Sequence, residues 1–370
     1  MPSGFDYLLP IGISFFTFQA LGYLIDCYLG KMEREQNFLR FANFVCFFPQ
    51  LLAGPIERAE HLLPQFQQCP PFRLQNLTDG ASLFLVGLFK KLALAGYLAL
   101  YVERIYDNPK ICSAPELIFG TVAYGWQIFF DFSGYTDMAR GVAKLMGFNL
   151  VINFNHPYLA TGLGDFWRRW HISFSRWILD YIFMPLQMQW RGWPWPKIAT
   201  AAALVVTFLF SGIWHGAGWT FVIWGALHGL GLAATNEWER SAFYRRRVPK
   251  LLKQAGVFCF VSFAWIFFRA DSLGDALLIV KRIFTGPWLD PNLPVLTGMN
   301  RFFIMAGLDL KIPALMLLLV ALVWLYQLIC ESKFRDLLKA GFVRVGIAVG
   351  LVLYLCLSAA GGGAFIYFRF

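Results

Sequence analysis

Long apolar stretches are the feature that most constrains what this chain can fold into. Only 15% of its 370 residues are charged, against about a quarter in an ordinary soluble protein. A helix needs about 20 mostly apolar residues to cross the hydrocarbon core of a membrane. The stretches that approach this length most clearly are 198–211 continued by 219–234, 255–268, 312–329 and 342–359, and less apolar ones are 8–29, 81–102, 117–132 and 177–188. The pattern therefore predicts an all-α polytopic membrane protein with about eight to ten transmembrane or re-entrant helices.

Basic residues give the chain a net charge of +10, which on its own would also suit a nucleic-acid-binding protein. Their distribution favours a membrane instead, because they gather between apolar runs, in 240–253 and 333–344. Short basic loops are typical of the cytoplasmic side of a membrane. These two loops are two crossings apart, so they predict the same side, with 269–311 facing outward. We expect the lipid bilayer, and no nucleic acid, as a partner.

The domain organisation is predicted to be simple. No linker, low-complexity tract or internal repeat divides the apolar segments, so we expect one membrane domain over residues 1–370. Residues 1–7 contain no basic segment and no small-residue cleavage site, so a cleavable signal peptide is not expected. The scattered cysteines form no C-x-x-C pair and are expected to be small buried hydrophobic residues. No H-x-x-x-H or H-E-x-x-H pattern occurs, and no metal site is expected.

Two polar stretches interrupt the apolar pattern in the first half. Residues 47–58 contain two prolines and a glycine, which would break a helix. Broken backbone at membrane depth needs protein or a wet cavity around it, so this stretch is predicted to be a re-entrant segment. In 127–137, Asp131 and Asp137 lie within an apolar run, and we expect them to cap or pin a helix bend through hydrogen bonds.

A first histidine lies in a stretch rich in tryptophan and arginine. Residues 167–181 predict one amphipathic helix at or in the membrane, with Arg168, His171 and Ser175 on a polar stripe at i, i+3 and i+7. A second stripe is aromatic and consists of Trp170, Phe174, Trp177 and Tyr181. An interfacial helix with an aromatic belt explains the tryptophans and arginines, and it permits the histidine without requiring it. Taken alone, this stretch is a weak functional signal.

A second histidine, His215, follows a nearly unbroken apolar run and is bracketed by Trp214, Gly216 and Gly218. An ionisable residue at membrane depth is costly, which makes a functional site the default hypothesis. The glycines would let a backbone or an extended ligand approach the ring. The alternative is a buried histidine that is hydrogen-bonded to a backbone carbonyl. His228 would lie about 20 Å along the same helix, if that helix is continuous, and is expected to be a structural partner outside the site.

Short motifs run along most of the chain, among them Trp-Arg-Arg-Trp-His ending at His171 and Trp-His-Gly-Ala-Gly-Trp around His215. They lie at 9–18, 49–55, 130–137, 153–158, 166–173, 214–219 and 365–368. In this order they resemble the membrane-bound O-acyltransferase (MBOAT) family, and within it the bacterial branch that acetylates exopolysaccharides such as alginate. The resemblance implies a bundle of helices around a central cavity, in a chain that lacks the family's first N-terminal helices. It also implies that His215 occupies the family's invariant histidine position and His171 its second active-site position.

The activity that the resemblance implies is acyl transfer from a thioester to a hydroxyl. His215 would be the general base, and His171 would orient the acceptor or donate a hydrogen bond to the developing oxyanion. The residues expected to bind substrate are Trp167, Arg168, Trp170, Trp214 and Ser175. No tightly bound cofactor is implied, and the donor would be acetyl-CoA or another acyl thioester from the cytoplasm. The acceptor would be an exopolysaccharide, reached with periplasmic acetyltransferase partner proteins, and the location would be the bacterial inner membrane.

Two alternatives stay open. One is D-alanyl transfer from a carrier protein toward teichoic acid, by an enzyme of the same architecture. The alginate-like residues at 54–58 and 215–218 favour acetyl transfer over it. The other is a polytopic transporter or flippase with Asp26, Asp131 and His215 lining a path. The absence of internal repeats and the two matched histidine motifs count against it. A serine hydrolase is poorly supported, because no G-x-S-x-G motif occurs.

Overall fold

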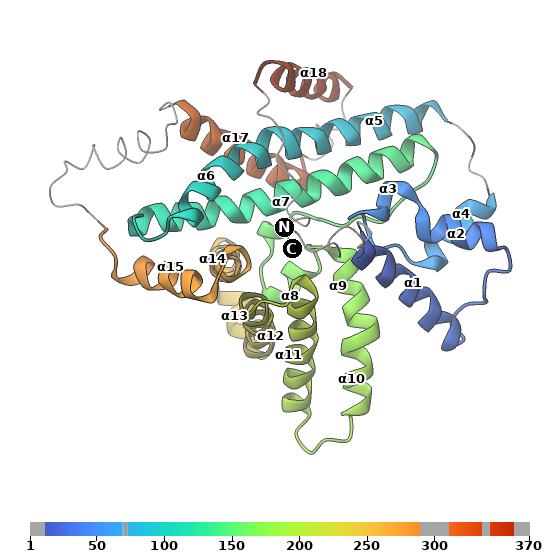
Figure 1. Ribbon diagram of the computed structural model, residues 1–370, viewed down its shortest axis with the longest axis horizontal. Coiled ribbons are helices and arrows are strands. Elements are labelled where there is room, and N and C mark those ends of the chain that lie inside the picture. The colour runs from blue at the N-terminus through green and yellow to red at the C-terminus, as the bar shows by residue number, and fades with distance from the viewer. Residues whose placement is uncertain (1–11, 69–70, 72, 289–310, 335–340, 359–370) are drawn as a thin grey trace, which may run out of the picture.

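The computed structural model describes residues 12–68, 71, 73–288, 311–334 and 341–358, and the regular secondary structure of these residues is entirely helical (Figure 1). This confirms the all-α class that the apolar runs predict. The helices of the N-terminal part lie together at one end of the molecule. They are α1 (Ile13–Tyr28), α2 (Phe38–Cys46), α3 (Phe48–Leu51) and α4 (Ala59–Gln68).

The body of the molecule is a layer of long helices. One helical run continues from α5 (Leu74–Phe89) through a π-helix, η1 (Lys90–Ala95), into α6 (Gly96–Asp107), and α7 (Ala114–Leu145) packs beside it. Ser113 and Glu116 begin α7 with a reciprocal cap, in which the Ser113 backbone N–H donates to the Glu116 carboxylate at 2.6 Å. Helices α17 (Lys311–Glu331) and α18 (Gly341–Ser358) contact the α5–η1 run.

The remaining helices carry the two histidine stretches. In Figure 1, α10 and α11 run side by side away from the α5–α7 layer. The first group is η2 (Pro157–Leu159), α8 (Leu163–Trp167), α9 (Ile172–Ile178), the π-helix η3 (Leu179–Phe183) and α10 (Met184–Gln189). The second is α11 (Pro196–His215), α12 (Trp219–Arg240), α13 (Ala242–Arg247), α14 (Lys250–Arg269) and α15 (Leu273–Thr285).

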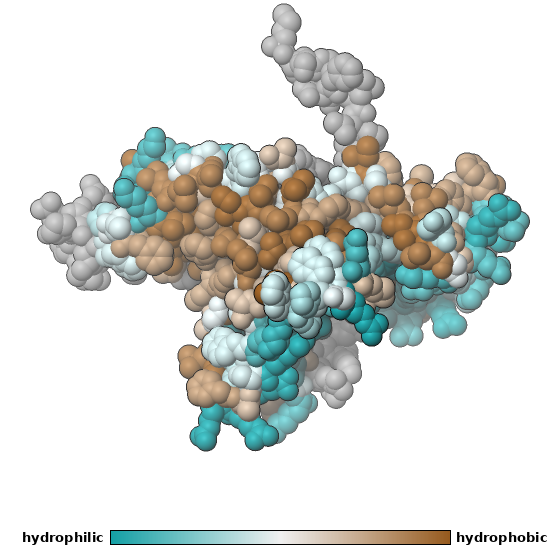
Figure 2. All heavy atoms as spheres, turned by 90° about the horizontal axis from the view of Figure 1, so that it is seen from below, coloured by the Kyte–Doolittle hydropathy of each residue, from teal (hydrophilic) through white to brown (hydrophobic). Residues whose placement is uncertain are grey.

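Length and composition identify three stretches among the described residues that can cross a membrane. They are Leu74–Asp107, Pro196–His215 and Lys250–Arg269, and shorter apolar helices cover Val320–Glu331 and Val345–Leu355. Figure 2 shows apolar residues in a broad band across the body, with hydrophilic residues at its ends and on the projecting part. The membrane class is thus confirmed. A total of about eight to ten segments, with short and broken ones included, stays a prediction.

Pairs of glycines set how closely α5 and α7 pack. A Cβ added at Gly87 would lie 2.5 Å from the carbonyl oxygen of Gly134, and one added at Gly80 would lie 2.8 Å from that of Gly141. A backbone carbonyl cannot swing away as the end of a long side chain can, so only glycine fits at these crossings. The two glycine pairs therefore hold the helix backbones in direct contact.

Charged side chains between α7 and η1 pair with each other. Lys91 contacts Asp131, and the Lys90 ammonium lies 2.6 Å from the Asp137 carboxylate. A charge without a partner at this depth would be costly, so each carboxylate needs its lysine. The two carboxylates were expected to pin a helix bend. In the structure they bind two lysines of the π-helix η1, which lie 40 and 47 positions away in the sequence.

Glycines also fix the packing of α12 against α11. A Cβ added at Gly225 would collide with the Phe208 carbonyl oxygen, and one added at Gly229 would lie 2.7 Å from the Val205 Cα. The spacing of four between these glycines puts both on the same face of α12. That face lies against α11 and thereby sets the position of the residues at the end of α11.

The chain turns back between α11 and α12. A single helix through both His215 and His228 is therefore wrong, since α11 ends at His215 and α12 begins at Trp219. A Cβ added at Gly216 would lie 2.5 Å from the ring of Phe221, so the turn needs glycine there. The apolar run suggested one helix, but its glycines end that helix and let the chain fold back.

Gly225→Ala is expected to lower the stability of the protein by about 1–3 kcal/mol, the usual cost of overpacking a tight interior. The added methyl group would collide with the Phe208 carbonyl and would lie 3.3 Å from the Gly212 Cα, and both groups belong to the backbone of α11. Gly256→Ala on α14 is the matched control, because no atom lies within 4 Å of a Cβ added there. Thermal unfolding of both variants in detergent would contradict this account if Gly225→Ala melted with the control.

Candidate active site

The stretch around His171 is not one helix. Residues 167–181 were predicted to form a single amphipathic helix, but α8 ends at Trp167 and α9 begins only after His171. His171 has φ 42° and ψ 54°, the left-handed region that a bulky residue rarely adopts. The polar stripe predicted for Arg168, His171 and Ser175 therefore does not exist, because the chain changes direction between them.

A neighbouring segment causes this break. The Ile172 N–H donates to the Asn153 carbonyl at 2.9 Å, and the Asn155 N–H donates to the Arg169 carbonyl at 2.9 Å. These two hydrogen bonds replace the helical ones that residues 168–171 would otherwise form. Tertiary contacts with a non-adjacent segment thus override the local helical pattern.

The His171 ring is held by one polar and several aromatic neighbours. Its Nδ1 lies 3.2 Å from the side-chain oxygen of Asn153, and both side chains are almost fully buried. Phe132 contacts the ring edge-on at 4.7 Å between centroids, and Phe174 packs at 5.1 Å. Its Nε2 is buried and has no hydrogen-bond partner among the residues that the structure describes. One ring nitrogen is therefore anchored, while the other is left for a ligand.

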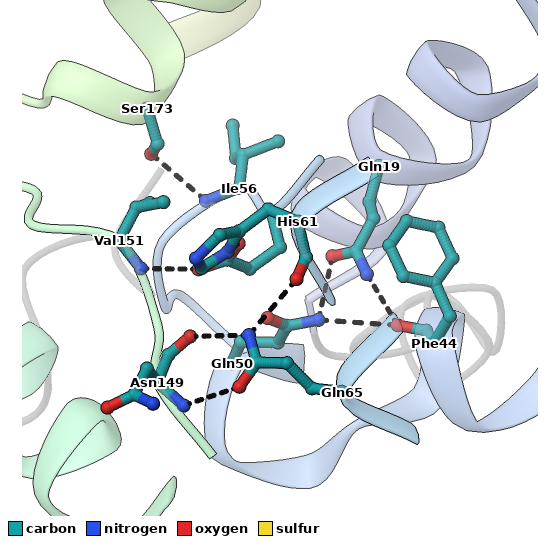
Figure 3. A network of polar contacts seen from close by, with 10 residues as sticks. Gln19, Phe44, Gln50, Ile56, His61, Gln65, Asn149, Val151 and Ser173 are labelled. Atoms are coloured by element: carbon teal, nitrogen blue, oxygen red, sulfur yellow. Dashed lines mark hydrogen bonds and ion pairs between the residues drawn. The ribbon is translucent and has the colours of Figure 1, made fainter. Parts of the chain in front are cut away.

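The broken segment 47–58 supports this arrangement from behind. The Ile56 N–H donates to the Ser173 hydroxyl at 3.0 Å, and that hydroxyl donates to the Asn153 oxygen at 2.9 Å. Figure 3 shows Ser173 and Ile56 facing each other across the gap between their elements. The predicted break in the helix is confirmed, and the Ile56 N–H at this break finds its partner in protein, as membrane depth requires.

A buried carboxylate holds the same two segments together. Glu57 accepts from the Val151 N–H at 2.5 Å and lies 2.7 Å from Nδ1 of His61. The hydrogen bond to Glu57 raises the pKa of His61, and partial burial opposes that rise. Glu57 thereby ties the 47–58 segment to the segment that carries Asn153.

His215 is the last residue of α11 and is 7% exposed. Its ring packs edge-on against Trp224 at 5.1 Å and against Phe268 at 5.0 Å, and Trp214 lies at 4.6 Å. His215 therefore comes from the end of α11, and rings from α12 and α14 surround it. The Phe221 ring lies against Gly216, and the approach of a backbone or an extended ligand to the His215 ring stays a prediction.

The two histidines, far apart in the sequence, come together around Phe174. The centroid of its ring lies 5.1 Å from that of His171 and 6.2 Å from that of His215. The Trp214 ring also stacks on Phe174, at 4.5 Å between centroids. Both rings therefore contact the same phenyl group within one aromatic cluster.

The other residues expected to bind substrate lie in different surroundings. Trp214 belongs to the site itself, whereas the Arg168 side chain is 74% exposed. The Ser175 hydroxyl donates to the Trp170 carbonyl at 3.0 Å. Trp167 donates to Nδ1 of His228 at 3.3 Å.

His228 lies next to the site and not in it. Its ring packs on Trp224 at 5.0 Å, while the ring of His215 packs on the same indole at 5.1 Å. The indole of Trp224 therefore contacts both imidazoles. The structural role predicted for His228 agrees with this placement and stays a prediction.

Asn153 and Ser173 are site residues that sequence reasoning missed. Both are polar, both are nearly fully buried, and both contact the His171 segment. The 153–158 motif contributed only to the family resemblance, with no role given to Asn153. Two asparagines close together within an apolar context were the signal, because a buried amide needs hydrogen-bond partners.

The chain was compared with known protein families. The model of MBOAT, the membrane-bound O-acyltransferase family, matches residues 33–273. This region contains both histidines, Asn153 and the 47–58 segment.

Curated relatives agree with the family match. The chain is 37% identical over 301 residues to "Peptidoglycan O-acetyltransferase" of Helicobacter pylori, which covers 74% of this chain and 56% of the relative. It is 39% identical over 298 residues to "Probable alginate O-acetylase AlgI" of Pseudomonas aeruginosa, covering 79% of this chain and 55% of the relative. It is 30% identical over 258 residues to "Teichoic acid D-alanyltransferase" of Streptococcus thermophilus, covering 67% and 61%. The chain spans little more than half the length of these relatives.

Proposed function

The chain belongs to the membrane-bound O-acyltransferase family, and on that premise we propose that it transfers an acetyl group from a cytoplasmic thioester to hydroxyls of an exported polysaccharide. The observation that carries the proposal is the meeting of His171 and His215 around Phe174. An ionisable residue buried in a membrane bundle is by default a candidate functional residue, and here two such imidazoles contact one ring.

The proposed reaction is a simple acyl exchange. A hydroxyl oxygen of the acceptor attacks the thioester carbonyl, and a C–O bond forms. His215 takes the hydroxyl proton as general base, since a neutral imidazole is a competent acceptor near neutral pH. The C–S bond then breaks, and the proton passes to the leaving thiolate. The products are an acetyl ester and a free thiol, so atoms and charge balance.

The walls of the site suit this chemistry. Rings of Phe174, Trp214 and Trp224 surround the imidazoles and keep bulk water from competing with the acceptor hydroxyl. For His171 two roles are compatible with the reaction, either orienting the acceptor hydroxyl or stabilising the oxyanion.

The proposal extends to donor, partners and location. The donor is acetyl-CoA or another acyl thioester, and no tightly bound cofactor takes part. Arg168, exposed on the surface, is available to an anionic donor, with Trp167, Trp170, Trp214 and Ser175 as further substrate-binding residues. The acceptor is an exopolysaccharide such as alginate, reached with periplasmic acetyltransferase partners. Residence in the bacterial inner membrane follows from a cytoplasmic donor and an exported acceptor.

Acetyl transfer is favoured over the alternatives. The relatives named as O-acetyl enzymes are 37–39% identical to the chain, and the D-alanyltransferase is 30% identical. A transport path lined by Asp26 and Asp131 has little support, because Lys91 contacts Asp131 and the Tyr181 hydroxyl donates to Asp26 at 2.6 Å. These carboxylates are engaged in contacts within the protein.

The ester content of the exported polymer tests the proposal. We expect that deleting the gene removes acetyl esters from the polysaccharide and that restoring it returns them, as acetate released by mild alkali. Release of D-alanine in place of acetate would favour the alternative acyl group. Unchanged acetate in the deletion strain, with no second copy of the gene present, would contradict the proposal.

A further inference from the structure

The side-chain oxygen of Asn153 collects three hydrogen-bond donors. It accepts from the Ser173 backbone N–H at 3.2 Å, from the Ser173 hydroxyl at 2.9 Å and from Nδ1 of His171 at 3.2 Å. A backbone N–H can only donate, so the atom that faces it must be the amide oxygen and not the amide nitrogen. The amide nitrogen points the other way, to the Thr136 hydroxyl at 3.5 Å. The orientation of the amide is therefore fixed by its partners.

This orientation determines the tautomer of His171. An amide oxygen carries no hydrogen, so the hydrogen between it and Nδ1 must belong to Nδ1. In a neutral imidazole the other nitrogen then carries the lone pair. Nε2 is that nitrogen, and it is buried with no partner among the described residues. His171 thus presents an acceptor, and not a donor, to whatever occupies the site.

The surroundings oppose a doubly protonated ring. Phe15 stacks on His171 at 6.3 Å, and Phe132 and Phe174 pack against it at 4.7 and 5.1 Å. A charged imidazolium there would lose its water without gaining a carboxylate, which is costly. The titratable group that faces His171 from α11 is His215, and a charge on that ring would also repel a second one.

We infer that Asn153 is a positioning residue, which holds His171 in its Nδ1-protonated tautomer so that Nε2 accepts a hydrogen bond from an acceptor hydroxyl. The inference rests on the proposed function and selects between the two roles that it leaves for His171. His171 then orients the acceptor and does not donate a hydrogen bond to the oxyanion. The hydroxyl bound by His171 is a second one on the sugar, since the attacking hydroxyl gives its only hydrogen to His215.

The backbone makes the arrangement rigid. His171 sits in the left-handed region, which is unfavourable for a residue other than glycine. The Asn153 carbonyl binds the Ile172 N–H at 2.9 Å while its side chain binds Nδ1, so both groups of Asn153 hold the same turn. The Ile56 N–H braces the Ser173 hydroxyl from the opposite side at 3.0 Å.

Nitrogen-15 NMR of the purified protein in liposomes tests the tautomer directly. Histidine is labelled with nitrogen-15, and the signals of His171 are identified by their loss in His171→Asn. We expect Nδ1 to carry the hydrogen and Nε2 to carry none at neutral pH. A hydrogen on Nε2 with a bare Nδ1 would overturn the inference. This measurement needs no turnover, so it can contradict the tautomer without contradicting the proposed function. The proposed function would instead be contradicted by a wild-type protein that transfers no acetyl group.

Asn153→Asp tests the consequence for activity. The carboxylate can still accept from all three donors, but it places a negative charge beside Nδ1. This charge stabilises the protonated ring, so the pKa of His171 should rise by about 1–3 units. Protonation removes the Nε2 lone pair, so the acid limb of the kcat/KM profile, to which protonation of His215 also contributes, should move to higher pH. Asn155→Asp is the matched control, because this residue is exposed and should leave the limb in place. An active Asn153→Asp protein with the wild-type limb would overturn the inference, and if the variant does not fold, the NMR result decides.

Discussion

His215→Ala is expected to reduce O-acetylation of the exported polymer by about 10²–10⁴-fold, the usual contribution of a general base. The ring sits at the end of α11 among Trp214, Trp224 and Phe268, none of which depends on it for a hydrogen bond that the structure records. Truncation should spare membrane insertion, and it leaves a cavity that lowers stability, as at His228. Acetate released from the polymer, normalised to the amount of protein in the membrane, measures the loss.

His228→Ala is the matched control for that loss. His228 is also fully buried and packs on the same Trp224 ring, at nearly the same distance as His215. Its replacement leaves a cavity and deprives Trp167 of its acceptor, so stability should fall while activity per folded molecule falls much less. Full acetylation by His215→Ala, in a strain without a second copy of the enzyme, would end the acyltransferase account of this site.

His171→Asn is expected to keep more activity than His171→Ala. Asparagine adopts the left-handed backbone at this position more readily than alanine does, so the turn before α9 survives. Its amide oxygen can still accept a hydrogen bond from a hydroxyl, which alanine cannot do. We expect His171→Ala to lose both the turn and the hydrogen bond.

The same polymer assay, with thermal unfolding of each variant, separates the two effects. His171→Gly provides the control, because glycine restores the backbone and offers no hydrogen bond. It should match His171→Asn in stability and His171→Ala in activity. Equal activity of the asparagine and glycine variants would contradict a hydrogen-bonding role for His171.

Much of the fold could be predicted because apolar runs report directly on membrane segments. The missing part was where those runs break. The turn at His171 depends on hydrogen bonds from Asn153 and Asn155, which lie in a separate segment, and no local pattern reveals them. The seven-residue spacing between Gly80 and Gly87, repeated between Gly134 and Gly141, was readable as a packing signal.

For the site, the motifs identified the two histidines but not what holds them. Asn153 lies 18 positions from His171, and Ile56 lies 117 positions from Ser173. Contacts over such separations are set by the whole fold and not by local propensity. The pairing of Asp131 with Lys91 was hidden for the same reason.

A double-mutant cycle tests the central claim most directly, namely that His171 and His215 act as one acyl-transfer site. His171→Asn, His215→Ala and the double variant are compared by transfer of labelled acetyl groups to polymer at equal protein level. Residues that act as a unit show strongly non-additive losses. We predict that the double variant is no less active than His215→Ala alone. Losses that multiply, so that the double variant falls below His215→Ala by the full factor of His171→Asn, would contradict a shared site.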